Sequence, residues 1–243
     1  MKPSVVLLTY DINEILAQMS KTAIESVKFS VPDCELIVID NASPFGGAFS
    51  RSEADIYVRN RQNVGYPGAV NQGMALANSE FVVLSNNDIK VSPNWWGVTQ
   101  EVMQSNPKVG TLHFRMDGYD EIRPLGNDIW IGGKERWCSS SFFVVRKEAF
   151  QGYDTNFHQG GYDDYDHHHR MRSKGWIQAY TNKACYQHAD SSTYQAMEVA
   201  GDNRSERDVK NREYFKSKHG EYPDVMFNTQ FANQMNIPWK PFL

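Results

Sequence analysis

Polar side chains that could hold a cation or a phosphate ester follow directly after three apolar segments of the sequence. Thr9, Tyr10 and Asp11 come after the first segment, Asp40 after the second, and the run Asn86-Asn87-Asp88 after the third. In an open parallel sheet the carboxyl ends of the strands share one edge, and ligands bind there. Carboxylates at such an edge can bind a divalent cation, which offsets the charge of phosphate groups. The spacing therefore predicts one ligand site built from three strand ends.

A second acidic group lies in the other half of the chain, where Asp163, Asp164 and Asp166 stand close together. A carboxylate can take the proton from an attacking hydroxyl, and neighbouring carboxylates raise one another's pKa. Asp166 and Arg170 have the i,i+4 spacing of an ion pair on a helix. The run His167-His168-His169 is not expected to bind one metal, because adjacent residues of a helix point in different directions. We expect structural or surface roles for these histidines.

Alternating apolar and amphipathic segments predict the elements that position the first group. Continuous apolar runs are typical of strands buried on both faces, and they occur at Ser4–Thr9, Glu35–Ile39, Asp55–Arg59 and Glu80–Ser85. A helix is expected after Asp11, with an apolar face made of Ile12, Ile15, Leu16, Met19, Ala23 and Val27. Pro67 suits the first turn of a second helix. Strands that alternate with helices predict an α/β fold with parallel pairing.

The second half of the sequence is less regular. Strands are expected at Val109–Arg115 and Ser140–Arg146, and helices at Asp164–Lys174 and Ser205–Lys218. We expect one domain over residues 1–220, with a regular first half of about 1–115 and a less regular second half of about 116–220. Residues 221–243 are expected to form a tail packed on the body.

Composition excludes several classes of protein. Lys plus Arg number 25 against 29 Asp plus Glu, so the chain has no general affinity for nucleic acid or anionic membranes. The 3 cysteines include no C-x-x-C pair, which argues against a disulfide scaffold or a zinc ribbon. No apolar segment reaches the ~20 residues that span a bilayer, and the N-terminus does not resemble a signal peptide. We expect a cytoplasmic protein, either soluble or peripheral to a membrane.

Neither a G-x-G-x-x-G dinucleotide fingerprint nor a P-loop occurs in the sequence. A nucleotide at the strand ends would therefore need a divalent cation on its phosphates.

Several segments, in order, resemble the successive blocks of the family 2 glycosyltransferases with the GT-A fold. They are Val5–Asp11 (VVLLTYD), Leu36–Ser43 (LIVIDNAS), Asn63–Gly73 (NVGYPGAVNQG), Phe81–Trp96 (FVVLSNNDIKVSPNWW), Gly161–Gly175 (GYDDYDHHHRMRSKG), His188–Ser192 (HADSS) and Tyr214–Gly220 (YFKSKHG). The resemblance covers roughly residues 4 to 220. It implies a GT-A fold, with a nucleotide-binding, mostly parallel sheet, flanking helices and a less regular C-terminal acceptor half.

The resemblance also implies which residues hold the donor. In the family, the turn after the first strand and the Asp after the second contact the base and ribose, and these positions are Thr9, Tyr10, Asp11 and Asp40. Asp40 would accept from a pyrimidine N3–H, which favours a uracil or thymine nucleotide. The next donor-side positions are Asn63, Gly65 and Asn71.

The family's D-x-D metal motif corresponds to Asn86-Asn87-Asp88. Asp88 keeps the charged metal ligand, and Asn86 and Asn87 stand on the donor side. His188 matches the position that supplies a further metal ligand in several GT-A enzymes. The implied cofactor is a divalent metal, Mn²⁺ or Mg²⁺, bound together with a UDP- or dTDP-linked sugar.

Asp164 aligns with the catalytic base of the family's E-D-x-D block. Asp163 replaces the usual Glu and is placed on the acceptor side, together with Asp166. Trp137 falls in the segment that lines the acceptor side in the family. The implied activity is transfer of a sugar to an acceptor hydroxyl with inversion, with Asp164 as general base.

Two other functions stay open on the residues. A nucleotidyltransferase-like enzyme would have a similar sheet and metal site, although the segment after Thr9 lacks the Gly- and basic-rich loop of such enzymes. A catalytically inactive nucleotide-sugar-binding module is also compatible with Asn86 and Asp163. The expected acceptor is a glycan, a lipid-linked glycan or another hydroxyl-bearing polymer. A hydroxymethylated base in viral DNA is the alternative acceptor, which the basic residues between 204 and 218 would contact.

Overall fold

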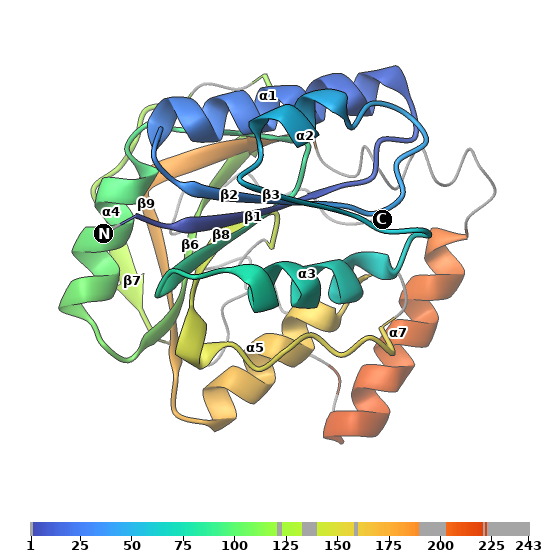
Figure 1. The fold of residues 1–243 in the computed structure, drawn as a ribbon. Coiled ribbons are helices and arrows are strands. Elements are labelled where there is room, and N and C mark those ends of the chain that lie inside the picture. Colours follow the sequence, from blue (N-terminus) through green and yellow to red (C-terminus); the bar gives the residue numbers. More distant parts are fainter. Residues whose placement is uncertain are drawn as a thin grey trace.

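The computed structural model describes residues 2–120, 123–132, 140–157, 160–189, 203–220 and 222. Its centre is a β-sheet in the order β3-β2-β1-β4-β8-β6-β9-β5, with β7 paired to β9, and Figure 1 shows helices on both faces. The strands are β1 (Ser4–Thr9), β2 (Glu35–Asp40), β3 (Ile56–Arg59), β4 (Phe81–Ser85), β5 (Ile89–Val91), β6 (Val109–Gly118), β7 (Ile129–Ile131), β8 (Phe142–Arg146) and β9 (Ile177–His188). The helices are α1 (Glu14–Ser30), α2 (Ala48–Glu53), α3 (Gly65–Leu76), α4 (Trp95–Ser105), α5 (Asp163–Ser173) and α7 (Arg204–His219), with a 3₁₀ turn η1 (Lys147–Ala149).

The first half of the sheet is parallel, because its strands are joined by crossover connections. β1 lies between β2 and β4, and β3 follows on the outside of β2. Val5 and Leu7 of β1 pack in the core that includes α1, whereas Val6 and Leu8 pack on the other face with α3. A strand buried on both faces needs a continuous apolar run. The expected α/β fold with flanking helices is confirmed.

The second half extends the same sheet with mixed pairing. β8 lies antiparallel between β4 and β6, and β9 runs parallel to β6. β5 and β7 each pair antiparallel with β9. The strands expected around residues 109–115 and 140–146 are β6 and β8. The sequence does not predict five further elements, which are α2, α4, β5, β7 and β9. In β9, polar residues interrupt the apolar pattern that would indicate a strand.

Helix α1 differs from the expectation on its buried face. It begins at Glu14, after Asn13 caps it by accepting a hydrogen bond from the Leu16 backbone N–H at 2.9 Å. The buried residues are Leu16, Ser20, Ala23, Ile24 and Val27. The expectation that Ile15 lies on this face is wrong, since its side chain is 68% exposed.

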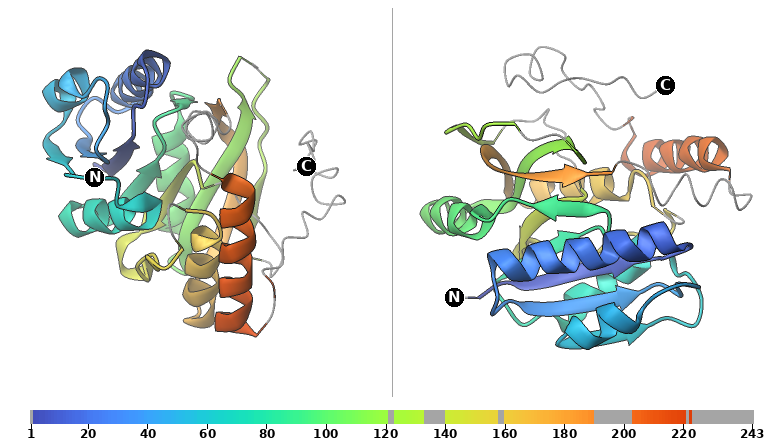
Figure 2. Two further views of the ribbon diagram at one scale, coloured as in Figure 1. Left: turned by 90° about the vertical axis from the view of Figure 1, so that its right-hand side faces the viewer. Right: turned by 90° about the horizontal axis from the view of Figure 1, so that it is seen from above.

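Helices α5 and α7 lie side by side, as Figures 1 and 2 show. Both were expected, and each ends before a glycine with positive φ, Gly175 (+84°) and Gly220 (+81°). Asn203 caps the start of α7 by accepting from the Glu206 backbone N–H at 3.1 Å. Within the described ranges, no helix combines the length and the apolar character needed to cross a membrane.

Candidate active site

The polar segments that follow the strands meet at one edge of the sheet, as the sequence predicts. Asn87 Nδ2 donates to Asp11 Oδ1 at 3.0 Å, and Ser20 Oγ donates to the same oxygen at 2.5 Å. The backbone N–H of Asn41 donates to the carbonyl of Thr9 at 2.8 Å. Hydrogen bonds thus join the ends of β1, β2 and β4 directly.

Asp11 is an acid held inside this edge. Its backbone N–H donates to Ser43 Oγ at 2.8 Å. Burial raises the pKa of Asp11 to about 6, although hydrogen bonds from Ser20 and Asn87 favour the ionised form. Beside it, Tyr10 is half-buried and the buried Thr9 Oγ1 has no hydrogen-bond partner among the described residues.

Asp40 is fully buried, and both of its carboxylate oxygens accept hydrogen bonds from the protein itself. The backbone N–H of Ser43 donates to Oδ1 at 2.8 Å, and Tyr57 Oη donates to Oδ2 at 2.5 Å. Arg59 Nη1 also donates to Oδ2, because the parallel register of β2 and β3 places Arg59 opposite Asp40. The side chain of Arg59 is 48% exposed, whereas that of Asp40 is 0% exposed. The contact between Asp40 and a pyrimidine stays a prediction.

The segment before α3 is tied to the same edge. Asn63 Oδ1 accepts from the Gly65 backbone N–H at 2.8 Å and from Asn41 Nδ2 at 2.7 Å. Gly65 has a φ of +78°, which favours glycine. The Asn71 side chain bonds both backbone groups of Tyr153, each at 2.8 Å, so its amide joins α3 to the segment that precedes α5.

Asp88 and His188 come together although they are far apart in the sequence. The antiparallel register of β5 and β9 places Ile89 opposite His188, so the preceding Asp88 lies beside the histidine. Asp88 Oδ1 is 3.2 Å from His188 Nε2. This oxygen and both ring nitrogens are buried without a hydrogen-bond partner among the described residues.

Two buried ligand atoms that face one another and lack hydrogen bonds fit a divalent cation. Among the described residues, no group of three or more His, Cys, Asp or Glu side chains could hold a metal. The remaining ligands of such a cation would have to come from a bound molecule. Asn86, just before, holds the strand end through a 2.8 Å hydrogen bond from its backbone N–H to the carbonyl of Ser141.

Asp163 and Asp164 form the first turn of α5. Asp164 Oδ2 accepts from Ser140 Oγ at 2.7 Å, and its Oδ1 accepts from the Tyr165 backbone N–H at 2.8 Å. Burial raises the pKa of Asp164 in spite of these bonds. Burial, and then the charge of Asp164, raise the pKa of Asp163 well above its usual range, and Asp163 Oδ2 has no hydrogen-bond partner in the described part of the chain. Burial thus raises the pKa of both carboxyl groups, and Ser140 and the Tyr165 backbone N–H hold the carboxyl group of Asp164 in place.

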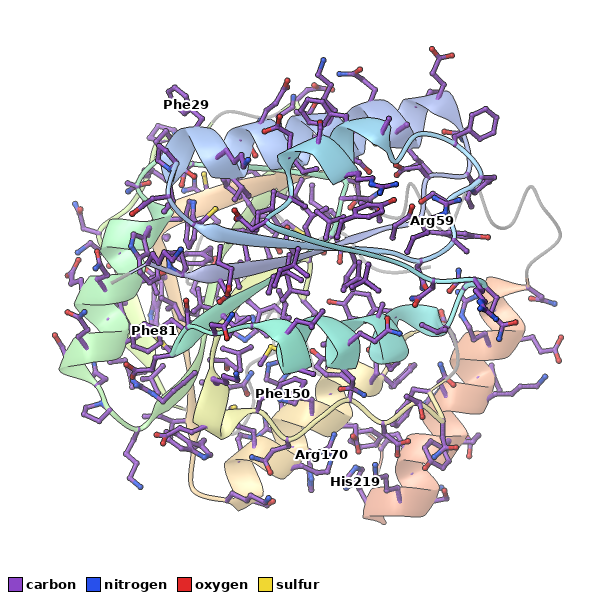
Figure 3. The ribbon with its side chains drawn as sticks, in the orientation of Figure 1. Phe29, Arg59, Phe81, Phe150, Arg170 and His219 are labelled. Atoms are coloured by element: carbon purple, nitrogen blue, oxygen red, sulfur yellow. The ribbon has the colours of Figure 1, made fainter. Side chains whose placement is uncertain are left out.

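Asp166 has a different environment from its two neighbours. The expected pair with Arg170 is present, with Arg170 Nε donating to Oδ2 at 2.8 Å. From α7, Lys218 Nζ and His219 Nε2 each lie 2.8 Å from Oδ1. Figure 3 shows Arg170 and His219 close together between the two helices. The carboxylate of Asp166 is 0% exposed. It therefore has no exposed oxygen in this structure with which to contact an acceptor, as its predicted acceptor-side role requires.

The three consecutive histidines point in three directions, as expected. His167 stacks on Tyr153 with ring centroids 5.0 Å apart. His168 packs against His113 and Phe143, while His169 packs against His219 of α7. Their role in the described structure is packing, and His167 and His168 are buried rather than at the surface.

Trp137, the expected acceptor contact, lies outside the described residues, as do Asp190 and residues 223–243. Trp95 is fully buried, and its Nε1 donates to Ser30 Oγ at 2.7 Å. Trp96 packs edge-on against Trp95, so this pair belongs to the core.

Sequence reasoning missed several partners of the site. The hydrogen bond from Ser140 to Asp164 could not be predicted, because a serine before a strand is common and indicates no particular partner. Arg59 could have been found, since it ends the third strand at the level where Asp40 ends the second. Lys218 and His219 could not be placed on Asp166 without knowing how α7 packs.

The family described as glycosyl transferase family 2 matches residues 4–181. Because this match spans most of the sequence, the chain belongs to that family, and it is a glycosyltransferase. No curated protein matches the sequence.

Solved structures share the fold at low sequence identity. Residues 1–349 of TarS from S. aureus superpose with a TM-score of 0.60 and 13% identity, covering 98% of this chain and 79% of that one. The same protein in complex with UDP gives 0.59 and 12%, covering 95% and 75%. GalNAc-T7 with UDP, GalNAc and Mn²⁺ gives 0.60 and 14%, covering 97% of this chain and 55% of that one. The chain thus has the GT-A fold of these glycosyltransferases.

Proposed function

We propose that this family 2 glycosyltransferase moves a sugar from a UDP- or dTDP-sugar to an acceptor hydroxyl with inversion, using Asp164 as general base. The observation that carries the proposal is the environment of Asp164, which opens α5, is held by Ser140 and has a raised pKa. The complexes of TarS with UDP and of GalNAc-T7 with UDP, GalNAc and Mn²⁺ support the choice of donor.

Asp164 is suited to take up the acceptor proton. A general base works best when its pKa lies near the working pH, and burial moves Asp164 in that direction. Ser140 Oγ fixes Oδ2, while the Tyr165 backbone N–H fixes Oδ1. As the acceptor oxygen attacks the anomeric carbon, its proton passes to Asp164 and the bond from that carbon to the phosphate oxygen breaks. The diphosphate leaves with the bonding electrons, and attack from the opposite face inverts the centre.

Asp88 and His188 are the residues that would hold the cation. Their facing atoms, Oδ1 and Nε2, are 3.2 Å apart, buried and without hydrogen bonds among the described residues. A bound Mn²⁺ or Mg²⁺ would supply positive charge beside the leaving diphosphate. Asn87 and Asp11, joined at 3.0 Å, brace the strand end that carries Asp88.

The donor nucleotide would lie at the ends of β1 and β2. Thr9 Oγ1 is a buried hydroxyl without a hydrogen-bond partner among the described residues, and Tyr10 is half-buried beside it. In this proposal Asp40, whose Oδ2 also accepts from Tyr57 and Arg59, accepts from N3–H of a uracil or thymine base. Residues 1–115 form the donor half and residues 116–220 the acceptor half of one domain in this proposal.

A glycan or lipid-linked glycan is the acceptor that we favour over DNA. Three lysines of α7 have partners in their own chain. Lys218 bonds Asp154 at 2.6 Å, and Lys210 pairs with Glu206 at 2.6 Å. Lys216 lies over the ring of Tyr222.

The test is single-turnover hydrolysis of UDP-glucose, UDP-N-acetylglucosamine and UDP-galactose with Mn²⁺, in which water replaces the acceptor. Asp164→Asn keeps the shape of the side chain but removes the basic oxygen. We expect its rate constant to fall by about 10²- to 10⁴-fold, the usual contribution of a general base. UDP affinity, measured by calorimetry, should change less than about twofold, because the proposed donor contacts lie at the strand ends and not in α5.

Asp166→Asn is the matched control, because the same substitution falls two positions along the same helix. It should lower the melting temperature and retain most of the activity, since the described partners of the Asp166 carboxylate are side chains of α5 and α7. Near-normal hydrolysis by Asp164→Asn together with an inactive Asp166→Asn would show that the general base is assigned to the wrong residue. Hydrolysis retained by both variants would rule out a catalytic role for the acidic cluster.

A further inference from the structure

The backbone before Asp163 follows an unusual course. Gly160, Gly161 and Tyr162 have φ values of +103°, +95° and +68°, so three consecutive residues lie in the left-handed region. Glycine adopts this region readily, whereas a tyrosine there is strained. The carbonyls of Gly160 and Gly161 lie before α5, outside the helices and strands of the described chain. These carbonyls need partners from elsewhere.

Asn211 of α7 supplies the partners. Its side-chain Nδ2 donates to the carbonyl of Gly160 and to the carbonyl of Gly161, both at 3.0 Å. The residue is 3% exposed, so water does not replace these bonds readily. An amide nitrogen carries two protons, and both are used here. Asn211 lies in α7, beyond the residues 4–181 that match the family.

The same short segment sets the start of α5. The Asp166 backbone N–H donates to the carbonyl of Tyr162 at 3.0 Å, which is the first hydrogen bond of that helix. A displacement of residues 160–162 would therefore move the first turn of α5, where Asp164 meets Ser140.

We infer that Asn211 is a positioning residue for the transfer reaction, which holds residues 160–162 so that Asp164 reaches the acceptor hydroxyl; this rests on the function proposed above. The side-chain hydrogen bonds of Asn211 go to Gly160 and Gly161, not to the strand-end donor residues or to Asp88. Loss of Asn211 should leave donor binding intact and slow the chemical step. A misplacement of the reacting groups by about 1 Å costs on the order of 10²-fold in rate.

Asn211→Ala removes both donors, and Asn211→Asp keeps the shape but turns acceptor oxygens toward the two carbonyls. The matched control is Asn203→Ala, the same substitution in the same helix at a residue that caps the Glu206 backbone N–H instead. The assay is single-turnover hydrolysis of whichever of the three UDP-sugars the wild type cleaves with Mn²⁺, and UDP affinity is measured by calorimetry.

We expect Asn211→Ala to lower the rate constant by about 10- to 100-fold and Asn211→Asp by at least as much. UDP affinity should stay within about twofold. The pH dependence of the rate should also shift, because the surroundings of Asp164 change. Amide hydrogen exchange over residues 160–166 should accelerate in both Asn211 variants. Asn203→Ala should change neither the rate, the pH profile nor this exchange.

Gly161→Ala perturbs the same segment from the other side. The added Cβ would lie 3.3 Å from Asp208 Oδ1 and would strain a backbone with φ +95°. It should reproduce the rate loss with unchanged UDP affinity, and combining it with Asn211→Ala should add little. Such non-additivity is expected of two changes that act through one contact.

Wild-type rate and pH profile in Asn211→Ala would overturn the inference. An equal loss of rate and of UDP affinity, or loss of the folded circular-dichroism spectrum in both Asn211→Ala and Gly161→Ala, would overturn it too, since the role would then be general to the fold. An inactive Asp164→Asn beside a fully active Asn211→Ala rejects the positioning role alone. A fully active Asp164→Asn rejects the proposed function itself.

Discussion

Acidification should destabilise this protein through His167, a histidine that is buried in the neutral form. Its ring stacks on Tyr153 at 5.0 Å and lies 5.1 Å from Phe150. Burial lowers the pKa of His167 to about 3, and the charge of Arg170 adds to this effect. An unfolded histidine has a pKa of about 6.5. Between these two values the unfolded chain binds a proton that the folded chain does not.

The sign and size of the effect follow from that difference. The free energy of unfolding falls as the pH drops from about 6.5 toward about 3, by about 1.4 kcal/mol per pH unit for this one residue. At pH 4.5, about two units below the unfolded pKa, His167 therefore lowers the stability by about 2.7 kcal/mol relative to pH 7.5. His167→Phe keeps an aromatic ring in the stack and removes the titration.

At pH 7.5 the variant should be slightly less stable than the wild type, by about 1 kcal/mol, because the Gln151 backbone N–H loses its acceptor. That hydrogen bond is long, at 3.4 Å. By pH 4.5 the order should reverse, with the difference in unfolding free energy shifted by about 2.7 kcal/mol in favour of the variant. In a protein of this size such a shift corresponds to about 5–11 °C in melting temperature.

Urea unfolding at a series of pH values measures this difference directly. The raised pKa of Asp11 acts in the opposite direction as the pH falls, but it is present in both proteins and cancels in the comparison. Tyr153→Phe is the control, because it alters the same stack through a hydroxyl whose pKa is raised well above 10. Its offset from the wild type should not depend on pH over this range. A difference for His167→Phe that stays constant from pH 7.5 to 4.5 would show that the folded protein accepts the proton, and would refute the reasoning.

Two further predictions concern the donor site. Asp88→Ala should abolish Mn²⁺-dependent binding of UDP or dTDP, and His188→Ala should weaken it, in calorimetry with and without Mn²⁺; unchanged affinity in Asp88→Ala would reject the metal assignment. Uracil and thymine nucleotides should bind ahead of GDP and CDP by about 1.5–3 kcal/mol if Asp40 accepts the base N3–H. Equal thermal protection by GDP and UDP would argue against that contact.

The sequence predicts the first half of the fold well because burial there is simple. Each strand is covered on both faces, so its apolar run is continuous, and β1, β2 and β4 stand where the runs are. β9 could not be found this way. It carries polar residues such as Asn182 and Lys183 in the middle of the strand. The helical spacing in α1 was visible, but the sequence could not tell that Ile15 points outward.

The strand-end site was predictable in outline and not in its internal bonding. The sequence predicts that Asp11, Asp40 and Asn87 share one edge, because the carboxyl ends of parallel strands do. It does not show that Tyr57 and Arg59 both donate to Oδ2 of Asp40, since that depends on the register of β2 against β3. The meeting of Asp88 with His188 likewise depends on the register of β5 against β9, and only the family resemblance anticipated it.

The acidic cluster shows most clearly why local sequence is insufficient. Asp163, Asp164 and Asp166 have the same side chain, yet the structure gives them different environments. Burial and the neighbouring charge raise the pKa of Asp163 well above its usual range, and burial raises that of Asp164 while Ser140 opposes it. Burial alone would raise the pKa of Asp166 too, but hydrogen bonds from Arg170, Lys218 and His219 outweigh burial and lower it. Only the Arg170 contact is local. Lys218 and His219 of α7 thus act together with Arg170 to lower the pKa of Asp166, whereas burial raises the pKa of both Asp163 and Asp164.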